Sequence, residues 1–280
     1  MSVSFGERVR AAIDARGRLC VGIDPHATLL AAWGLDATAA GAREFGLRVV
    51  DAAAATVGIV KPQVSFFEPY GSQGYAALED VIRAAREAGL LVIADAKRGD
   101  IGSTMDAYAA AWLTPGSPLE ADAMTANPFL GTGALEGTFT LAETHGKGVF
   151  VLAATSNPDA ATSQRATAGD GRTVSAQIIR EVSERNARTT PDGEWASLGF
   201  VIGATVDWRE AGLTSFAPSA PILGPGFGFQ GADPRDLEAR FGTAAHLVVA
   251  AESRSILSAG PEGVREAIIR RAAAYGGVHV

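Results

Sequence analysis

The chain has 280 residues, of which 47% are hydrophobic and 20% charged, and its formal net charge at pH 7 is −7. Such a composition can supply a large buried core and excludes an intrinsically disordered chain. The negative charge argues against a general nucleic-acid or anionic-membrane surface, because phosphate groups would be repelled. Nucleic acid and membrane are therefore not expected as partners, whereas a local pocket can still bind a small anion.

Cysteine and histidine usage gives no indication of a metal site. Cys20 is the only cysteine, so neither an internal disulfide nor a cysteine-based zinc site can form. The four histidines lack metal-ligand spacing; they are His26, His145, His246 and His279. Residues 1–18 carry charges without the apolar centre of a signal peptide, and no uncharged apolar run approaches the roughly 20 residues of a membrane helix. We expect a cytoplasmic protein.

Short apolar runs alternate with helix-like stretches along the whole chain. The runs are almost entirely apolar, which is typical of parallel strands buried on both faces. Eight strands are predicted: Leu19–Asp24, Val57–Val64, Leu90–Asp95, Ala121–Thr125, Gly148–Ala154, Leu198–Ala204, Pro221–Gly224 and His246–Ala251. Apolar residues at helical spacing mark further segments: Glu7–Ala15, Ala39–Ala54, Gly74–Glu87, Ser175–Arg188 and Glu262–Ala274.

Eight successive β-then-α units without a break in composition favour one closed (β/α)₈ TIM barrel, a single α/β domain over residues 1–280. A doubly wound open sheet is the alternative. Two connections are longer than the rest, Asn157–Arg172 after the fifth strand and the glycine-rich Pro225–Pro234 after the seventh. Long loops at this end of a barrel usually line or cover the active site.

Polar residues stand where the predicted strands end, which is where barrel enzymes carry their chemistry. They are Asp24, Lys61, Asp95, Lys97, Asp100, Asn127, Ser156, Gln230, Glu252 and Arg254. Any one of them alone is explained by solvation at a strand end. As a set they are expected to converge on the mouth of the barrel.

The strongest local pattern is Asp95-Ala-Lys-Arg-Gly-Asp-Ile-Gly-Ser-Thr104. Asp95 and Lys97 are two residues apart at the end of an extended segment, so we expect their side chains on the same face. Lys61 interrupts another buried run at the equivalent strand end. Alternating ammonium and carboxylate groups keep one another ionised when water is removed. A structural ion-pair network between neighbouring strands is the alternative interpretation.

This ten-residue motif, preceded by Lys61, resembles the signature of the orotidine 5′-phosphate decarboxylase family, and it is most similar to the longer, bacterial-type branch. Further stretches carry the resemblance along most of the chain: 21–25, 60–62, 155–158, 224–231 and 253–254. The resemblance implies decarboxylation of orotidine 5′-phosphate to uridine 5′-phosphate and CO₂, the last step of de novo UMP biosynthesis. It also implies a homodimer and no cofactor.

Residue by residue, the resemblance implies that Lys61, Asp95, Lys97 and Asp100 form a catalytic tetrad. In the family, the aspartate that matches Asp100 comes from the second subunit.

Other matching positions are expected to bind substrate. Ile101 and Thr104 match residues that reach the neighbouring site. Asp24 and Lys61 match contacts to the ribose hydroxyls. Ser156 matches a contact to the pyrimidine, and Gln230 and Arg254 match the phosphate ligands. The sequence Ala251-Glu-Ser-Arg-Ser255 lacks a glycine found before this arginine in some relatives.

The tetrad suggests a mechanism without a cofactor. Loss of CO₂ from C6 of orotate leaves a carbanion that the ring cannot delocalise. The Lys97 ammonium can stabilise this charge and then protonate the carbon. Asp95 near the departing carboxylate would disfavour the ground state, while Lys61 and Asp100 fix the charges around both.

Three competing interpretations remain open. The spacing of Gly226, Gly228 and Gly231 matches a dinucleotide fingerprint, although Pro234 and only a short helix follow it. A barrel lysine such as Lys61 or Lys97 could serve a Schiff-base lyase or aldolase, but flanking carboxylates keep a lysine protonated and poorly nucleophilic. A non-catalytic barrel that binds phosphate ligands is the third possibility.

Overall fold

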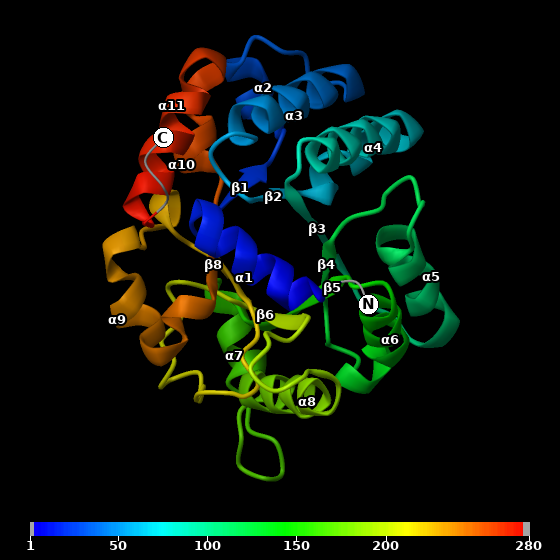
Figure 1. Cartoon of the computed structure of the whole chain (residues 1–280), viewed down its shortest axis with the longest axis vertical. Helices are drawn as coiled ribbons and strands as arrows, with labels where there is room; N and C mark the ends of the chain where they lie inside the picture. The colour runs from blue at the N-terminus through cyan, green and yellow to red at the C-terminus, as the bar shows by residue number, and fades with distance from the viewer. Residues whose placement is uncertain (1–2, 277–280) are drawn as a thin grey trace.

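A computed structural model describes residues 3–276, so His279 and both ends of the predicted domain lie outside the described residues. Eight parallel strands pair in chain order and close a barrel (Figure 1). They are β1 Leu19–Ile23, β2 Ile59–Pro62, β3 Leu91–Arg98, β4 Ala123–Ala126, β5 Gly148–Ala154, β6 Leu198–Ile202, β7 Ile222–Pro225 and β8 Val248–Glu252. The predicted TIM barrel is confirmed, and the open-sheet alternative is wrong because β1 pairs with β8.

Helices surround the barrel, and α1 crosses one of its openings in Figure 1. Their bounds are α1 Phe5–Arg16, α2 Ala27–Ala32, α3 Ala39–Ala53, α4 Gly71–Glu87, α5 Gly102–Leu113, α6 Glu136–Thr144, α7 Ala161–Gln164, α8 Val174–Thr189, α9 Leu237–Phe241, α10 Arg254–Leu257 and α11 Gly260–Ala274. The segment 157–172, predicted as a loop, contains α7 and an isolated bridge between Thr167 and Thr173.

The sixth unit departs from the predicted β-then-α repeat. Residues 203–221, all of which the structure describes, form turns and extended backbone without an α-helix. Gly212 has a positive φ of 68°, and Pro218 and Pro221 follow it, so backbone amides needed for a helix are missing. The eighth strand also begins later than predicted, because His246 lies in a 3-10 helix, Gly242–Leu247.

Buried residues fill both sides of the strands. Every residue of β1, β6 and β8 is buried, as the nearly continuous apolar runs indicate. At the opening that α1 covers, Phe5 packs edge-on against Phe150 with ring centroids 5.9 Å apart. A Cβ at Gly148 would lie 2.0 Å from the Phe5 ring, so glycine permits this close approach.

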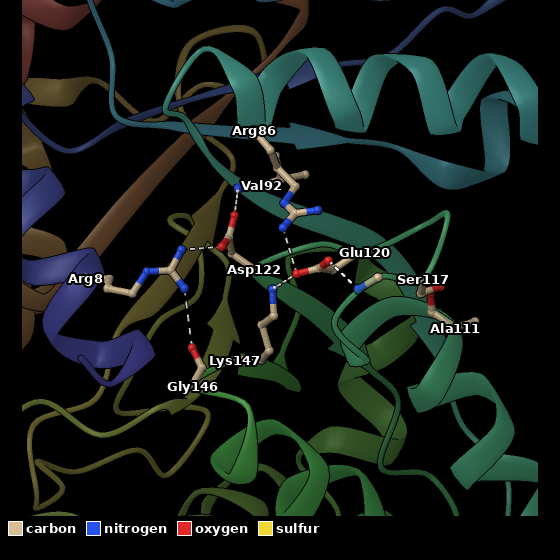
Figure 2. Close-up of polar contacts among 10 residues, drawn as sticks. Arg8, Arg86, Val92, Ala111, Ser117, Glu120, Asp122, Gly146 and Lys147 are labelled. Carbon is tan, nitrogen blue, oxygen red and sulfur yellow. Dashed lines mark hydrogen bonds and ion pairs between the residues drawn. The ribbon is translucent and has the colours of Figure 1, made fainter. Parts of the chain in front are cut away.

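A polar network closes the same end of the barrel (Figure 2). Glu120 accepts hydrogen bonds from Lys147 Nζ at 2.7 Å, Arg86 Nη2 at 2.7 Å and the Gly116 amide at 2.8 Å. Beside it, Asp122 pairs with Arg8 of α1 and accepts from the Val92 amide. These groups precede β4 and β5, so they lie at the end where barrel residues serve stability and leave the opposite mouth for chemistry.

Candidate active site

Charged residues from three neighbouring strands meet at the opposite mouth. Asp24 follows β1, Lys61 belongs to β2, and Asp95 belongs to β3. All three line one cavity of about 190 Å³, together with Gln230 after β7 and Arg254 after β8. Of the ten residues predicted to be catalytic or to bind substrate, these five are thus brought into one cavity by the strand order.

Asp95 is the centre of a buried ion-pair cluster. Its Oδ2 lies 2.7 Å from Lys61 Nζ, and its Oδ1 lies 2.5 Å from Lys97 Nζ. Thr125, near the end of β4, donates the third hydrogen bond to this carboxylate, from Oγ1 to Oδ1 over 2.9 Å. Lys61 and Asp95 are only 8% and 7% exposed, so these charges have little water to solvate them.

The electrostatics of the cluster keep it ionised. Burial by itself would raise the pKa of Asp95, but the positive charges of Lys61 and Lys97 lower it below its ordinary value. Burial would likewise lower the pKa of Lys61, yet the negative charges of Asp95 and Asp24 raise it. Asp95 and Lys61 therefore keep their opposite charges across the neutral pH range.

Lys97 reaches Asp95 by a different route from the one predicted. Its backbone is left-handed, with a φ of 48°, and the register with β4 shifts between Ala94 and Arg98. The premise of a regular extended segment is therefore wrong at Lys97, although both side chains still meet. Half of the Lys97 side chain is exposed, and it lines a different, larger cavity of about 730 Å³ between the β4 and β5 loops.

The cavity offers unpaired polar groups to a ligand. Asp24 Oδ1 and Ser253 Oγ are buried and have no hydrogen-bond partner among the described residues. Arg254 stacks over the Phe229 ring at 4.1 Å and forms no ion pair within residues 3–276. Its charge is free to bind an anion.

The glycine-rich segment 226–231 lacks the geometry of a dinucleotide site. Gly228 begins a 3-10 turn and Gly231 follows it, with positive φ values of 66° and 99°, and the next α-helix, α9, has five residues. A dinucleotide fingerprint also needs an acidic residue about 20 positions on to bind the ribose, but Glu252, which stands there, is already held by Arg271, Tyr275 and Ser255. The segment therefore shapes the cavity wall.

Besides Lys97, four predicted residues lie outside the cavity that contains Asp95. Ser156 is exposed and lines a separate small pocket with Gln164 and Arg165. Asp100 accepts a hydrogen bond from the Ile101 amide at 2.8 Å and forms no ion pair within the described chain. Ile101 is 63% exposed, and Thr104 is exposed on α5.

Two neighbours of the tetrad escaped the sequence interpretation. Thr125 bonds to both Asp95 and the Lys97 amide. Gln63 lies 3.4 Å from Lys61 Nζ and lines the cavity. The sequence does contain an indication of each residue. Thr125 is a polar residue in a predicted buried strand, and Gln63 stands two positions after Lys61.

Residues 3–276 contain no group of three or more His, Cys, Asp or Glu side chains placed to hold a metal ion. Within the same residues, no helix has both the length and the apolar character needed to cross a membrane.

The chain is similar to known proteins over nearly its whole length. The family model described as Orotidine 5′-phosphate decarboxylase / HUMPS family matches residues 17–267. A Corynebacterium efficiens protein named orotidine 5′-phosphate decarboxylase is 48% identical over 279 residues, which is 99% of each chain. A Salinispora arenicola protein of the same name is 51% identical over 259 residues, covering 92% of this chain and 91% of that protein.

A solved structure agrees with the sequence comparisons. A Streptomyces avermitilis crystal structure, described as a candidate orotidine 5′-phosphate decarboxylase, superposes with a TM-score of 0.92 at 46% identity. The match covers 98% of this chain and 95% of that one.

Proposed function

Because the chain belongs to the orotidine 5′-phosphate decarboxylase / HUMPS family and is a carboxy-lyase, we propose how its own residues remove CO₂ from orotidine 5′-phosphate. The product is uridine 5′-phosphate, the end of de novo UMP biosynthesis. We further propose a cytoplasmic enzyme whose residues 1–280 form one domain. The observation that supports the mechanism is the Lys61–Asp95–Lys97 cluster at the barrel mouth, in which Lys61 and Asp95 are buried and Lys97 is half exposed.

Lys97 is the proposed proton donor. Departure of CO₂ leaves the bonding electron pair on C6 of the pyrimidine, and no ring orbital accepts it. An ammonium facing C6 stabilises that charge and then transfers a proton to the carbon. Lys97 suits this role because its side chain is half exposed beside the larger cavity while its Nζ stays 2.5 Å from Asp95 Oδ1.

Asp95 has the complementary role. A carboxylate fixed by Lys61 and Thr125 repels the substrate carboxylate and favours its departure. Two like charges about 4 Å apart repel by on the order of 4 kcal/mol at an effective dielectric constant near 20. Enzymes lower barriers by roughly 8–23 kcal/mol, so stabilisation of the carbanion must supply most of the effect.

The unpaired groups of the cavity fit the rest of the substrate. Asp24 Oδ1 can accept a hydrogen bond from a ribose hydroxyl, with Lys61 beside it. Arg254 and Gln230 line the same cavity and are proposed to bind the phosphate. Ser156 is proposed as the pyrimidine contact; it must move toward the tetrad, as closure of segment 157–172 would allow.

A second copy of the chain is proposed to complete the site. Asp100, Ile101 and Thr104 do not line the cavity, and Ile101 is one of several exposed large apolar side chains. Phe129 is 85% exposed and Leu130 52% exposed, which is unusual for large apolar residues unless another surface covers them. A homodimer would cover these groups and bring Asp100 to its partner's Lys97.

The test of the reaction is the loss of orotate absorbance when purified protein meets orotidine 5′-phosphate, with and without a chelator. We expect activity in both conditions, no turnover by Lys97→Ala, and normal turnover by the surface control Arg235→Ala. Near-normal kcat of Lys97→Ala would contradict the mechanism. Borohydride trapping of a substrate adduct would instead support a Schiff base on Lys61 or Lys97.

The test of the shared site mixes two inactive proteins, Lys97→Ala and Asp100→Ala. A hybrid dimer contains one site with both residues intact, so subunit exchange is expected to restore activity. Exchange without recovery would show that Asp100 does not act across the dimer.

A further inference from the structure

Arg98 contacts the peptide group that orients Lys97. Its Nη1 lies 3.4 Å from the Ala96 carbonyl oxygen, and the Lys97 amide donates to Thr125 Oγ1 over 2.9 Å. The Ala96 carbonyl and the Lys97 amide belong to one peptide unit. That unit is therefore held from both sides, by a guanidinium on one and a hydroxyl on the other.

The backbone at Lys97 requires such support. Among residues 3–276 it is the only non-glycine residue with a positive φ. A left-handed conformation costs an L-residue roughly 1–2 kcal/mol, and it persists only where the surroundings impose it. The register shift between Ala94 and Arg98 shows that the ladder with β4 does not impose it, since Lys97 has no ladder partner there.

Arg98 is itself firmly anchored. Its Nη2 donates to Glu68 Oε1 at 2.5 Å, and Tyr75 of α4 donates to the same oxygen at 3.0 Å. The hydrogen bond from Arg98 lowers the pKa of Glu68, so this carboxylate stays charged. The guanidinium also lies over the Tyr108 ring of α5 at 5.5 Å. The Arg98–Glu68 ion pair thus joins two segments. Glu68 lies after β2, the strand that contains Lys61, and Arg98 ends β3.

We propose that Arg98 is a positioning residue: anchored by Glu68, it keeps the Ala96–Lys97 peptide in the orientation that directs the Lys97 ammonium to Asp95. This inference rests on the proposed role of Lys97 as proton donor. Arginine is required because the two ends of its planar guanidinium contact Glu68 and the Ala96 carbonyl at the same time. A lysine ammonium at this position could make only one of these two contacts at a time.

The experiment compares Arg98→Gln and Arg98→Lys with the native enzyme. A displacement of about 1 Å at a reacting group can cost on the order of 100-fold in rate, so Arg98→Gln is expected to lose about that factor in kcat. Affinity for uridine 5′-phosphate should stay unchanged, because Arg254 and Asp24 bind the distant parts of the nucleotide. Arg98→Lys should recover part of kcat, and added guanidinium ion should partly rescue Arg98→Gln.

The matched control is Arg43→Gln, which removes an arginine ion-paired to Asp80 between α3 and α4. It should leave kcat unchanged. If Arg98→Gln does not fold, Glu68→Gln takes its place, since it weakens the anchor and keeps the Arg98 contact to Ala96; a fall in kcat with unchanged nucleotide affinity is expected.

Failure of the positioning role can be distinguished from failure of the proton-donor assignment. Native kcat in Arg98→Gln or its substitute, with an inactive Lys97→Ala protein, would overturn the positioning role alone. Activity in Lys97→Ala would overturn the proton-donor assignment itself. A loss of nucleotide affinity equal to the loss of kcat, without guanidinium rescue, would assign Arg98 to general structure and would also overturn the proposal.

Discussion

Replacing Asp95 by asparagine removes the negative charge that Lys61 and Lys97 share and keeps the size of the side chain. At the observed 2.7 Å from Lys61 Nζ, two unit charges attract by about 6 kcal/mol at an effective dielectric constant near 20. Desolvation of both groups offsets part of this. Loss of one partner from a buried pair costs about 3–5 kcal/mol, because the other charge stays buried without compensation.

We therefore expect Asp95→Asn to lose about 3–5 kcal/mol of unfolding free energy in urea at pH 7. At roughly 2–4 °C per kcal/mol for a chain of this size class, the melting temperature should fall by about 10 °C. Lys61→Met combined with Asp95→Asn should regain part of this loss, since no unpaired charge then remains at Lys61.

Asp80 provides the matched control. It also pairs with two cations, Arg43 and Arg83, but those side chains are 46% and 61% exposed. Asp80→Asn should cost less than about 1 kcal/mol, because water already screens exposed pairs. Equal losses for Asp80→Asn and Asp95→Asn would refute the argument that burial gives the cluster its energy.

The stabilisation that Asp95 contributes through its pair with Lys61 has a defined pH dependence. The pKa of Asp95 is lowered in the folded protein, so its stabilising contribution is fully present above the ordinary aspartate pKa of about 4 and is lost as pH falls through the lower folded pKa. The stability gap between the native protein and Asp95→Asn should therefore be constant from about pH 5 to pH 7 and narrow in acid. A gap that narrows already near pH 6 would contradict a lowered pKa.

Three further predictions concern the rim of the site. Arg254→Ala should raise KM for orotidine 5′-phosphate at least tenfold, about 1.4 kcal/mol or more, and weaken uridine 5′-phosphate binding in calorimetry, because a charge-assisted phosphate contact is lost; unchanged binding would exclude Arg254 from the phosphate site. Glu252→Gln should lower the unfolding free energy by about 3 kcal/mol in urea, since Arg271 loses its buried partner; a change below about 1 kcal/mol would show that the pair behaves as an exposed one. Phe129→Asp should shift the protein toward monomers in sedimentation and lower activity at high dilution, and an unchanged assembly would place the contact elsewhere.

The strand pattern could be predicted from sequence because burial on both faces leaves a nearly continuous apolar run. The fifth strand, Gly148–Ala154, has the predicted bounds. The missing helix between β6 and β7 was harder to foresee, because its segment still contains apolar residues such as Leu213 and Phe216. Those residues pack against the barrel from turns, so their burial does not require helical spacing.

The site was only partly predictable for a related reason. Strand order brings Asp24, Lys61 and Asp95 together whatever the details of each loop. The left-handed backbone of Lys97 depends on Thr125, 28 positions later, and the anchor of Arg98 depends on Glu68, 30 positions earlier. Contacts of this range follow from the closed barrel and leave no local periodicity in the sequence.

The two ends of the barrel hold similar charged groups, and what separates them is how completely those groups are satisfied. At the end covered by α1, Glu120 has two cations and a backbone amide as partners, and the pKa of Glu120 is lowered although burial opposes this.

At the mouth, the same kind of cluster is left incomplete. Asp24 keeps a buried oxygen without a partner among the described residues, Lys97 is half exposed on a strained backbone, and Arg254 has no carboxylate within residues 3–276. A folded chain tolerates unpaired buried groups at a cost of about 1–3 kcal/mol each. A ligand with hydroxyl and phosphate groups bound there would recover that cost, so the incomplete end of the barrel is the end that we propose binds substrate.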